Sequence, residues 1–499
     1  MSIIQTDCTL RDGGYYTGWD FDEDIVRDYF KLIEELPIEY LEIGYLNKPK
    51  DTYFGEFYYL PDHTLLEISN LTSKKLAFMI DSKDCKVSDL ENLVPRVKEY
   101  VSMIRLATDP SKIQHSLDLA REIAKYGIKV ALNIMYISKV NAGHEIFDSL
   151  GDIDGYVDIL NLVDSYGSVY PNDIPQIVEN FREVTPVNLG FHGHNNVELA
   201  YANCLVALSV GITHIDTTVL GMGRGAGNLK TEMLLTYRKS KLDQVVDLNV
   251  VGKLVDVFSG LHAKHKWGSN LAYMVSGNYT LPQKDVMEAL EINRYSLAGI
   301  VSSLDPEAKL SLPIFKSDNK IKNCLIVGGG QSVRDHLPGI KSFLSQNKDC
   351  TVVHSSSKYM NTFKGIANEQ IFAVAGDELL NLGKTSSSYK YVLEPSPRKV
   401  NCSISNLDGF YELSKVSFID RYHDSPLTIS LQITSDLFSD EIYLAGFDGY
   451  SETSSRKQLY IMKENEDILY EFGSGGLLSL TPTNYKNLQK ISIYGLLVR

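Results

Sequence analysis

Two histidines in the segment HGHNN, His192 and His194, have the spacing of a metal-binding pair. Side chains at positions i and i+2 of a strand point to the same face, so both imidazoles can reach one ion. The segment TLRDGG near the N-terminus contributes Asp12, which can add a carboxylate oxygen. Two nitrogens and one oxygen leave positions open for water or substrate, which is typical of a catalytic site. The pattern predicts a divalent ion, with Mn²⁺ or Mg²⁺ ahead of Zn²⁺ or Co²⁺.

A glycine-rich segment, GMGRGAGN at residues 221–228, is the third candidate part of this site. Its glycines permit close backbone approach, and Asn228 can bind the ion or orient another ligand. Each segment also has a simpler explanation: two hydrogen-bonded histidines, an Arg-Asp ion pair in a turn, and a loop that binds nothing. The metal hypothesis therefore depends on the three segments meeting at one place in the fold.

Eight short aliphatic runs alternate with amphipathic stretches over the first 220 residues, and each candidate segment directly follows one of these runs. The alternation predicts a parallel sheet whose strands are joined by helices, such as Ile25–Leu36, Ser111–Tyr126 and Asp173–Val184. Eight such units in about 240 residues predict a (β/α)8 TIM barrel, with the active site at the C-terminal ends of the strands. The three segments should therefore converge. The expected strands are Ile3–Thr6, Tyr40–Gly44, Lys75–Ile80, Met103–Leu106, Lys129–Asn133, Asp158–Val163, Val187–Phe191 and His214–Thr217.

Six segments together resemble the metal-dependent lyase and synthase barrels. In chain order they are TLRDGG, LEIGY, IRLAT, LVDSYGSVYP, HGHNN and GMGRGAGN. That superfamily includes 4-hydroxy-2-oxovalerate aldolase, 3-hydroxy-3-methylglutaryl-CoA lyase and isopropylmalate synthase. Among these, the sequence most resembles the 4-hydroxy-2-oxo acid aldolases, over roughly residues 1–280.

The resemblance implies an aldolase or lyase that cleaves or forms a C–C bond of a 4-hydroxy-2-oxo acid through a metal-bound, pyruvate-type enolate. It implies Asp12, His192 and His194 as metal ligands. Arg11 would donate to the enolate oxygen, and Ser165 would lie beside the carboxylate of the substrate. A divalent ion and a guanidinium place fixed positive charge where negative charge develops. The expected substrates are a small 2-oxo acid and an aldehyde.

One position departs from the aldolase pattern, in which a histidine three residues after the metal-binding aspartate acts as general base. Here that position is Tyr15. A tyrosine, with an ordinary pKa of about 10, is a weak base at neutral pH unless nearby positive charge lowers that pKa. The base is thus Tyr15, a metal-bound water or another group such as His144. Glu42 and Asp81 end the second and third strands, where either could orient a ligand, move a proton or pair with Arg105.

Two other functions fit the same segments. A Claisen-type synthase that joins a 2-oxo acid to an acyl-CoA shares the enolate and the ion with the aldolases. A barrel that has lost catalysis and serves as a binding or scaffold partner is the alternative that the missing histidine supports.

A second, smaller α/β pattern follows the barrel. We expect the barrel at residues 1–282, a helical segment and linker at 283–320, and a Rossmann-like domain at 321–499. The helical segment predicts one or two helices within Gln283–Leu304. The expected strands of the last domain are Cys324–Val327, Thr351–His354, Ile371–Ala375, Tyr391–Glu394, Val416–Ile419 and Ile442–Gly446.

The turn GGGQS lies between the first of these strands and an expected helix, Val333–Leu344. Such a turn can hold a phosphate, which predicts contacts from Gly328, Gly330 and Ser332. It lacks the lysine of a P-loop and the third glycine of a dinucleotide fingerprint. The domain therefore binds a nucleotide or nucleotide sugar, serves assembly, or carries an independent second catalytic site.

Composition and charge exclude several classes of protein. A chain of 499 residues is too long for one ordinary domain. With 49 Lys and Arg against 63 Asp and Glu, the formal net charge is −14, which repels nucleic acid. No stretch approaches the roughly 20 apolar residues of a membrane helix, and the N-terminus lacks the features of a signal peptide. Six cysteines without CxxC spacing predict a reduced, cytoplasmic protein, and we expect a homo-oligomer.

Overall fold

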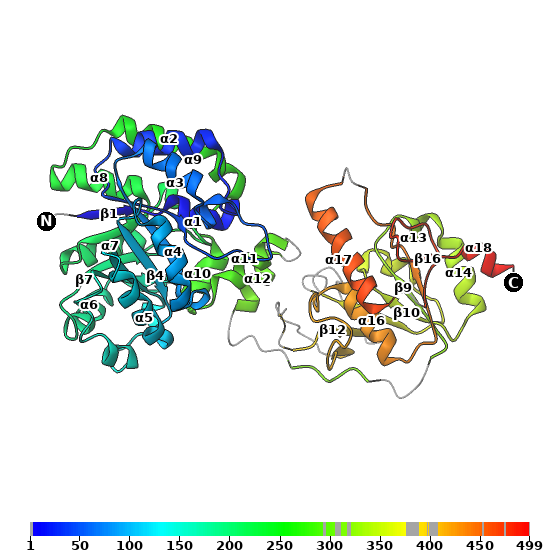
Figure 1. Ribbon diagram of the computed structural model, residues 1–499. Coiled ribbons are helices and arrows are strands. Elements are labelled where there is room, and N and C mark those ends of the chain that lie inside the picture. The colour runs from blue at the N-terminus through cyan, green and yellow to red at the C-terminus, as the bar shows by residue number, and fades with distance from the viewer. Residues whose placement is uncertain are drawn as a thin grey trace. The chain divides into compact units, whose positions relative to one another are not determined.

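The computed structural model describes residues 3–292, 296–304, 311–316, 321–375, 389–396, 398, 408–451, 454–473 and 476–498. The chain divides into two compact units, Met1–Met287 and Glu288–Arg499. Each unit is built on its own parallel sheet (Figure 1). Residues 305–310 and 317–320 of the expected linker lie outside the described residues. None of the helices in the described part of the chain is long and apolar enough to span a membrane.

The first unit is a closed barrel of eight parallel strands that pair in chain order, which confirms the expected barrel. Its helices lie outside the strands (Figure 1). Each strand begins and ends within two residues of its predicted run. The strands are β1 (Ile4–Asp7), β2 (Tyr40–Tyr45), β3 (Lys75–Asp81), β4 (Met103–Thr108), β5 (Lys129–Ile134), β6 (Ile159–Asp164), β7 (Asn188–Gly193) and β8 (His214–Thr217).

The helices of this unit follow the amphipathic stretches of the sequence. In chain order they are α1 (Thr9–Thr17), α2 (Glu23–Glu34), α3 (Asp62–Leu71), α4 (Leu90–Val97), α5 (Ile113–Ala124), α6 (Ile174–Arg182), α7 (Ala200–Ser209), α8 (Thr231–Leu242), α9 (Leu248–His265) and α10 (Leu271–Asn278). Two further helices, α11 (Gln283–Ile292) and α12 (Leu297–Leu304), occupy the segment for which one or two were expected.

The interior of the barrel is apolar at one level and polar at the next. One buried apolar cluster consists of Tyr40, Ala77, Met103, Ala131 and Ile159. Since side chains on one face of a strand are two residues apart, the next inward positions lie closer to the carboxyl ends of the strands. These positions are Glu42, Met79, Arg105, Asn133 and Asn161, all buried and four of them polar. The polar layer lies directly below the ends of the strands and supports the candidate site.

The second unit is an eight-stranded parallel sheet with the order β13-β12-β11-β10-β9-β14-β15-β16. Helices cover both of its faces (Figure 1). Successive residues of the central strand β9 pack into two separate cores: Cys324 and Ile326 into one, Leu325 and Val327 into the other. The strand order reverses between β9 and β14, which is where open parallel sheets usually bind ligands.

The bounds of the second unit's elements are as follows. The strands are β9 (Asn323–Val327), β10 (Thr351–His354), β11 (Gln370–Val374), β12 (Lys390–Leu393), β13 (Phe410–Glu412), β14 (Glu441–Ala445), β15 (Leu477–Ser479) and β16 (Gln489–Lys490). The helices are α13 (Ser332–Asp335), α14 (Leu337–Gln346), α16 (Pro426–Asp436), α17 (Arg456–Phe472) and α18 (Ile493–Leu497).

Two expected elements of this unit are wrong. The strand predicted at Val416–Ile419 lies earlier, at β13, and the N–H of Ser417 bonds to Gln432 Oε1 at 2.9 Å instead of to a neighbouring strand. The single helix predicted at Val333–Leu344 is divided into α13 and α14. Pro338 has no backbone N–H, so it fits the first turn of a new helix better than the interior of a continuous one.

Candidate active site

The segment TLRDGG is the first part of a helix, not the turn that the sequence suggested. Strand β1 ends at Asp7, Cys8 follows, and α1 begins at Thr9. Glycines let this helix pack closely, because a Cβ at residue 13 would lie 2.6 Å from the sulfur of Met222. Arg11 and Asp12 are therefore held rigidly at the end of the strand, and both are buried.

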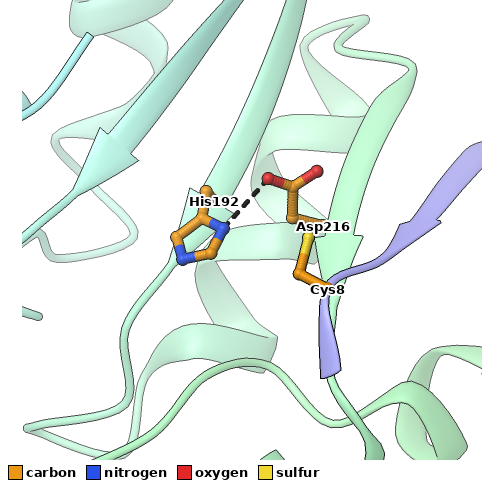
Figure 2. Close-up of side chains that lie close together, drawn as sticks. All are labelled: Cys8, His192 and Asp216. Atoms are coloured by element: carbon orange, nitrogen blue, oxygen red, sulfur yellow. Dashed lines mark hydrogen bonds and ion pairs between the residues drawn. The ribbon is translucent and has the colours of Figure 1, made fainter. Parts of the chain in front are cut away.

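The two histidines are each oriented by a hydrogen bond at Nδ1. In His192, Nδ1 lies 2.9 Å from Asp216 Oδ2, and the other ring nitrogen points away from that carboxylate (Figure 2). In His194, Nδ1 lies 2.8 Å from the main-chain oxygen of Asp164, so it must carry the proton and donate. Burial and the neighbouring His192 lower the pKa of His194 to about 3. A neutral imidazole with its proton on Nδ1 leaves Nε2 free to bind a metal ion.

Asp12 lies between the histidines and the glycine-rich segment. Its Oδ2 is 3.6 Å from His192 Nε2 and accepts a hydrogen bond of 2.6 Å from the amide of Asn228. Burial opposes ionisation of Asp12, but Arg11 and the two histidines outweigh it and hold the pKa of Asp12 below its ordinary value. The amide oxygen of Asn228 is buried without a hydrogen-bond partner. The three segments thus converge as predicted.

Beneath these residues, Arg105 is enclosed by carboxylates. It pairs with Asp216 and, at 3.2 Å, with Glu42, which also accepts a hydrogen bond of 2.7 Å from Arg11 Nε. Burial opposes ionisation of Asp216, but Arg105 and His192 outweigh it and hold the pKa of Asp216 well below its ordinary value. Glu42 therefore holds two arginines in place and lies behind the residues that line the cavity.

Cys8, His192 and Asp216 form a second group with metal-binding chemistry. One ligand atom of each lies within 4.8 Å of the others, so this buried set is consistent with a metal site (Figure 2). Burial, followed by the charges of Asp216 and Glu42, raises the pKa of the Cys8 thiol well above its ordinary value, so the thiol keeps its proton. The same Asp216 oxygen already accepts from His192, from Asn161 at 2.7 Å and from Arg105.

A cavity of about 210 Å³ opens above this layer at the carboxyl ends of the strands. It is small by comparison with the several hundred Å³ of a drug-sized pocket, which fits a substrate of a few carbon atoms. Seven of the residues singled out in the sequence line it: Arg11, Asp12, Tyr15, Asp81, Ser165, His192 and His194. Among them, Asp81 pairs with Lys83 at 2.7 Å.

The candidate bases occupy different places. The hydroxyl of Tyr15 lies 3.1 Å from that of Tyr45, and both side chains line the cavity. Burial raises the pKa of Tyr45 well above its ordinary value, so Tyr45 keeps its proton. His144 instead caps a short helical turn, accepting a hydrogen bond of 3.1 Å from the N–H of Ile146.

Sequence reasoning missed several other lining residues, among them five with cationic or titratable side chains: Lys83, Lys112, His115, Tyr136 and Arg224. Lys83 and Tyr136 directly follow β3 and β5, so the rule that active sites lie at strand ends could have found them. Arg224 lies inside the glycine-rich segment, of which the sequence analysis considered only the glycines and Asn228.

In the second unit, the turn GGGQS lines a cavity of about 710 Å³ at the switch point of the sheet. The N–H donors of all three residues predicted to hold a phosphate are already engaged. The N–H of Ser332 bonds to Asp448 Oδ2 at 2.9 Å, and those of Gly328 and Gly330 bond to main-chain oxygens at 2.8 and 2.9 Å. A phosphate held by the N–H groups of Gly328, Gly330 and Ser332 does not fit these contacts, and at Ser332 a carboxylate takes the place of the anion.

Comparison with known proteins places the barrel among enzymes. The HMGL-like family matches residues 2–257. A 4-hydroxy-2-oxovalerate aldolase of Geobacillus thermodenitrificans is 25% identical over 234 residues, covering 46% of this chain and 67% of the relative. An oxaloacetate decarboxylase of Mycobacterium tuberculosis is 25% identical over 241 residues, covering 46% and 68%.

Solved structures agree with the fold. The N-terminal domain of a Bacteroides vulgatus protein with a provisional aldolase assignment is 42% identical, with a TM-score of 0.57, covering 60% of this chain and 99% of that domain. Pyruvate carboxylase of Rhizobium etli, at 14% identity and a TM-score of 0.50, covers 61% of this chain and 33% of its own and shares the fold alone.

Replacing Asp216 with Asn should lower the free energy of unfolding of the barrel by about 3–5 kcal/mol, because Arg105 then stays buried with less negative charge beside it. Denaturant unfolding at pH 7 measures the change. Since the pKa of Asp216 is depressed by folding, its contribution to stability is lost as the pH falls below about 4. Asp24→Asn is the control, because Asp24 pairs with Arg27 on an exposed face. Equal stability of Asp216→Asn and wild type would contradict this role.

Proposed function

Because this chain belongs to the HMGL-like family, we propose that its barrel is a metal-dependent aldolase that cleaves or forms a C–C bond of a 4-hydroxy-2-oxo acid. The observation that carries the proposal is that Arg11, Asp12, His192 and His194 line one small cavity at the ends of the strands. The aldolase and decarboxylase names of the relatives support a 2-oxo acid as substrate.

The side chains around Asp12 fit a divalent ion. They offer two imidazole nitrogens, a carboxylate oxygen and the buried amide oxygen of Asn228, a set suited to Mn²⁺ or Mg²⁺. The buried ion pairs of the site also favour a cation, because their net charge is 2 − 3 = −1. The groups are two guanidinium groups, of Arg11 and Arg105, and three carboxylates, of Asp12, Glu42 and Asp216. When bound, a divalent ion supplies Lewis acidity toward the ketone oxygen of the substrate.

Of the two candidate ligand sets, we infer that Asp12, His192 and His194 hold the ion. Nε2 of His192 faces Asp12, whereas its Nδ1 is engaged by Asp216. The Cys8 thiol is protonated and accepts from Arg105 at 3.4 Å, so it makes a weak ligand. Cys8 and Asp216 would then orient the site from below.

The chain's own residues divide the remaining work. Arg11 is fixed through Nε by Glu42 and lines the cavity, so its guanidinium can donate to the substrate oxygen on which charge accumulates. Ser165 lines the cavity and accepts a hydrogen bond of 2.9 Å from the N–H of Tyr136, which leaves its own proton for the substrate carboxylate. Tyr15 is the candidate base for the substrate hydroxyl, and the hydroxyl of Tyr45, 3.1 Å from its oxygen, can donate a hydrogen bond to it.

Pyruvate in D₂O tests the proposal directly. An enzyme of this class should exchange the methyl protons of pyruvate in the presence of Mn²⁺, and NMR follows the loss of that signal. A chelator should stop the exchange, and added Mn²⁺ should restore it. Absence of exchange with both pyruvate and 2-oxobutyrate, in a folded protein that binds Mn²⁺, would overturn the proposal.

Replacing His194 with Ala should abolish stoichiometric Mn²⁺ retention, whereas Cys8→Ser should keep it, because only the first removes a ligand of the inferred set. Elemental analysis after dialysis measures the metal, and circular dichroism checks the fold. If His194→Ala retains Mn²⁺ and Cys8→Ser loses it, the ligands are instead Cys8, His192 and Asp216.

Replacing Arg11 with Lys should lower turnover by roughly 10²–10³, since a point charge does not reproduce the fork that Glu42 holds in place. Steady-state kinetics with the substrate found above gives the ratio. The exposed Arg27, changed to Lys, is the matched control. Near wild-type turnover of Arg11→Lys would remove this residue from the mechanism.

For the second unit, we propose that the cavity at the switch point, lined by Gly328, Gly330 and Lys358, binds a nucleotide or nucleotide sugar. The support is its place and size, since open parallel sheets bind ligands where their strand order reverses. Ser332 is excluded from the contacts because Asp448 engages it.

Calorimetry of the full chain with nucleotides and nucleotide sugars tests this second proposal. Binding should weaken at least about tenfold in Lys358→Gln, because the variant removes a cation from the cavity. Lys390→Gln is the control, since Lys390 pairs with Glu369 on the surface. If none of these ligands gives a saturable heat of binding, a role in assembly is favoured instead.

A further inference from the structure

One guanidinium of the barrel cavity, that of Arg224, has no part in the proposed reaction. Arg224 follows β8 in the glycine-rich segment, lines the cavity and lies 5.4 Å from the ring centre of Tyr15. Its Nε is buried without a hydrogen-bond partner. Among the residues that the structure describes, no carboxylate lies within ion-pair distance of it.

The other two arginines of the site are in the opposite situation. Arg11 and Arg105 each pair with two carboxylates. Acidic residues are not scarce in this chain, which has 63 of them against 49 basic ones. A partly buried guanidinium without a partner costs free energy, because it has lost water without gaining an opposite charge. Such an arrangement is expected where the partner is a ligand.

Two further cationic side chains line the same cavity. Lys83 and Lys112 line it together with Arg224, against the carboxylates of Asp81 and Asp109. Lys83 is paired with Asp81, whereas Arg224 faces the cavity beside Tyr15, which occupies the position of the proposed base. The cationic side chains of the cavity outnumber its acidic ones in this group by three to two, and Arg224 beside Tyr15 can receive a negative group of the substrate.

We propose that Arg224 binds a carboxylate or phosphate on the aldehyde substrate, so that the acceptor is a short anionic aldehyde. The inference rests on the proposed function and extends it to the class of the second substrate. Arginine suits the task because its planar fork binds either anion through two parallel hydrogen bonds. The cavity of about 210 Å³ limits the aldehyde to a few carbon atoms.

Matched aldehydes test the proposal. The wild-type protein, with Mn²⁺ and pyruvate, should condense succinic semialdehyde better than butanal, or glyceraldehyde 3-phosphate better than glyceraldehyde, by about 10–100-fold in kcat/KM. The two pairs distinguish carboxylate from phosphate. In Arg224→Gln this preference should disappear, mainly through the KM of the aldehyde, and Arg224→Lys should restore part of it. Arg27→Gln is the control on an exposed arginine.

Deuterium exchange of pyruvate separates this inference from the function on which it rests, because exchange needs no aldehyde. If Arg224→Gln reduces exchange as much as condensation, Arg224 serves the 2-oxo acid and the inference is wrong. The inference is also wrong if Arg224→Gln keeps the preference for the anionic aldehyde, or if the wild type shows no such preference. If the wild type shows no exchange at all, the proposed function fails. Calorimetry with glutarate and inorganic phosphate then tests the anion site by itself. Binding of either anion to the wild type that is lost in Arg224→Gln supports the site. Absence of binding to the wild type refutes it.

Discussion

The buried charge of Arg105 is the constraint on which the candidate site depends. A guanidinium inside a barrel is tolerated only when carboxylates surround it, and removal of one partner is strongly destabilising. Asp216 and Glu42 are those partners. Each also contacts a residue of the layer above, Asp216 through His192 and Glu42 through Arg11. One buried ion pair network thereby fixes the direction of an imidazole and of a second guanidinium before any substrate arrives.

The alternation of side chains along each strand explains why this network lies directly below the site. The apolar level that contains Met103 closes the barrel, and the inward position two residues later on the same strand is Arg105. On β5, likewise, the inward position two residues after the apolar Ala131 is the polar Asn133. Along β2, β4, β5 and β6, the apolar residue that packs the barrel and the polar residue that supports the site therefore lie two positions apart on the same face of the strand.

The sequence predicted the parts of the site that depend on local pattern. Eight strands could be found because aliphatic runs are short and regular, and His192, His194 and Asp12 because each follows such a run. The network below them could not be predicted in the same way. Arg105 and Asp216 are 111 residues apart, and their pairing appears only when β4 and β8 enter one closed barrel. The hydrogen bond from Ser332 to Asp448 could not be predicted for the same reason, because the two residues are 116 positions apart.

The helical start of α1 shows a different limit of local reasoning. Two glycines after Asp12 suggested a turn, since glycine is unfavourable in helix interiors. Here they lie in a helix because Met222 and Trp19 pack where a Cβ would be. Their lower helix propensity is offset by the close approach of α1 to the segment that carries Arg224 and Asn228. The glycines therefore bring residues of the first and last strand ends together at one cavity, where Arg11 is paired with carboxylates and Arg224 has none within ion-pair distance among the described residues.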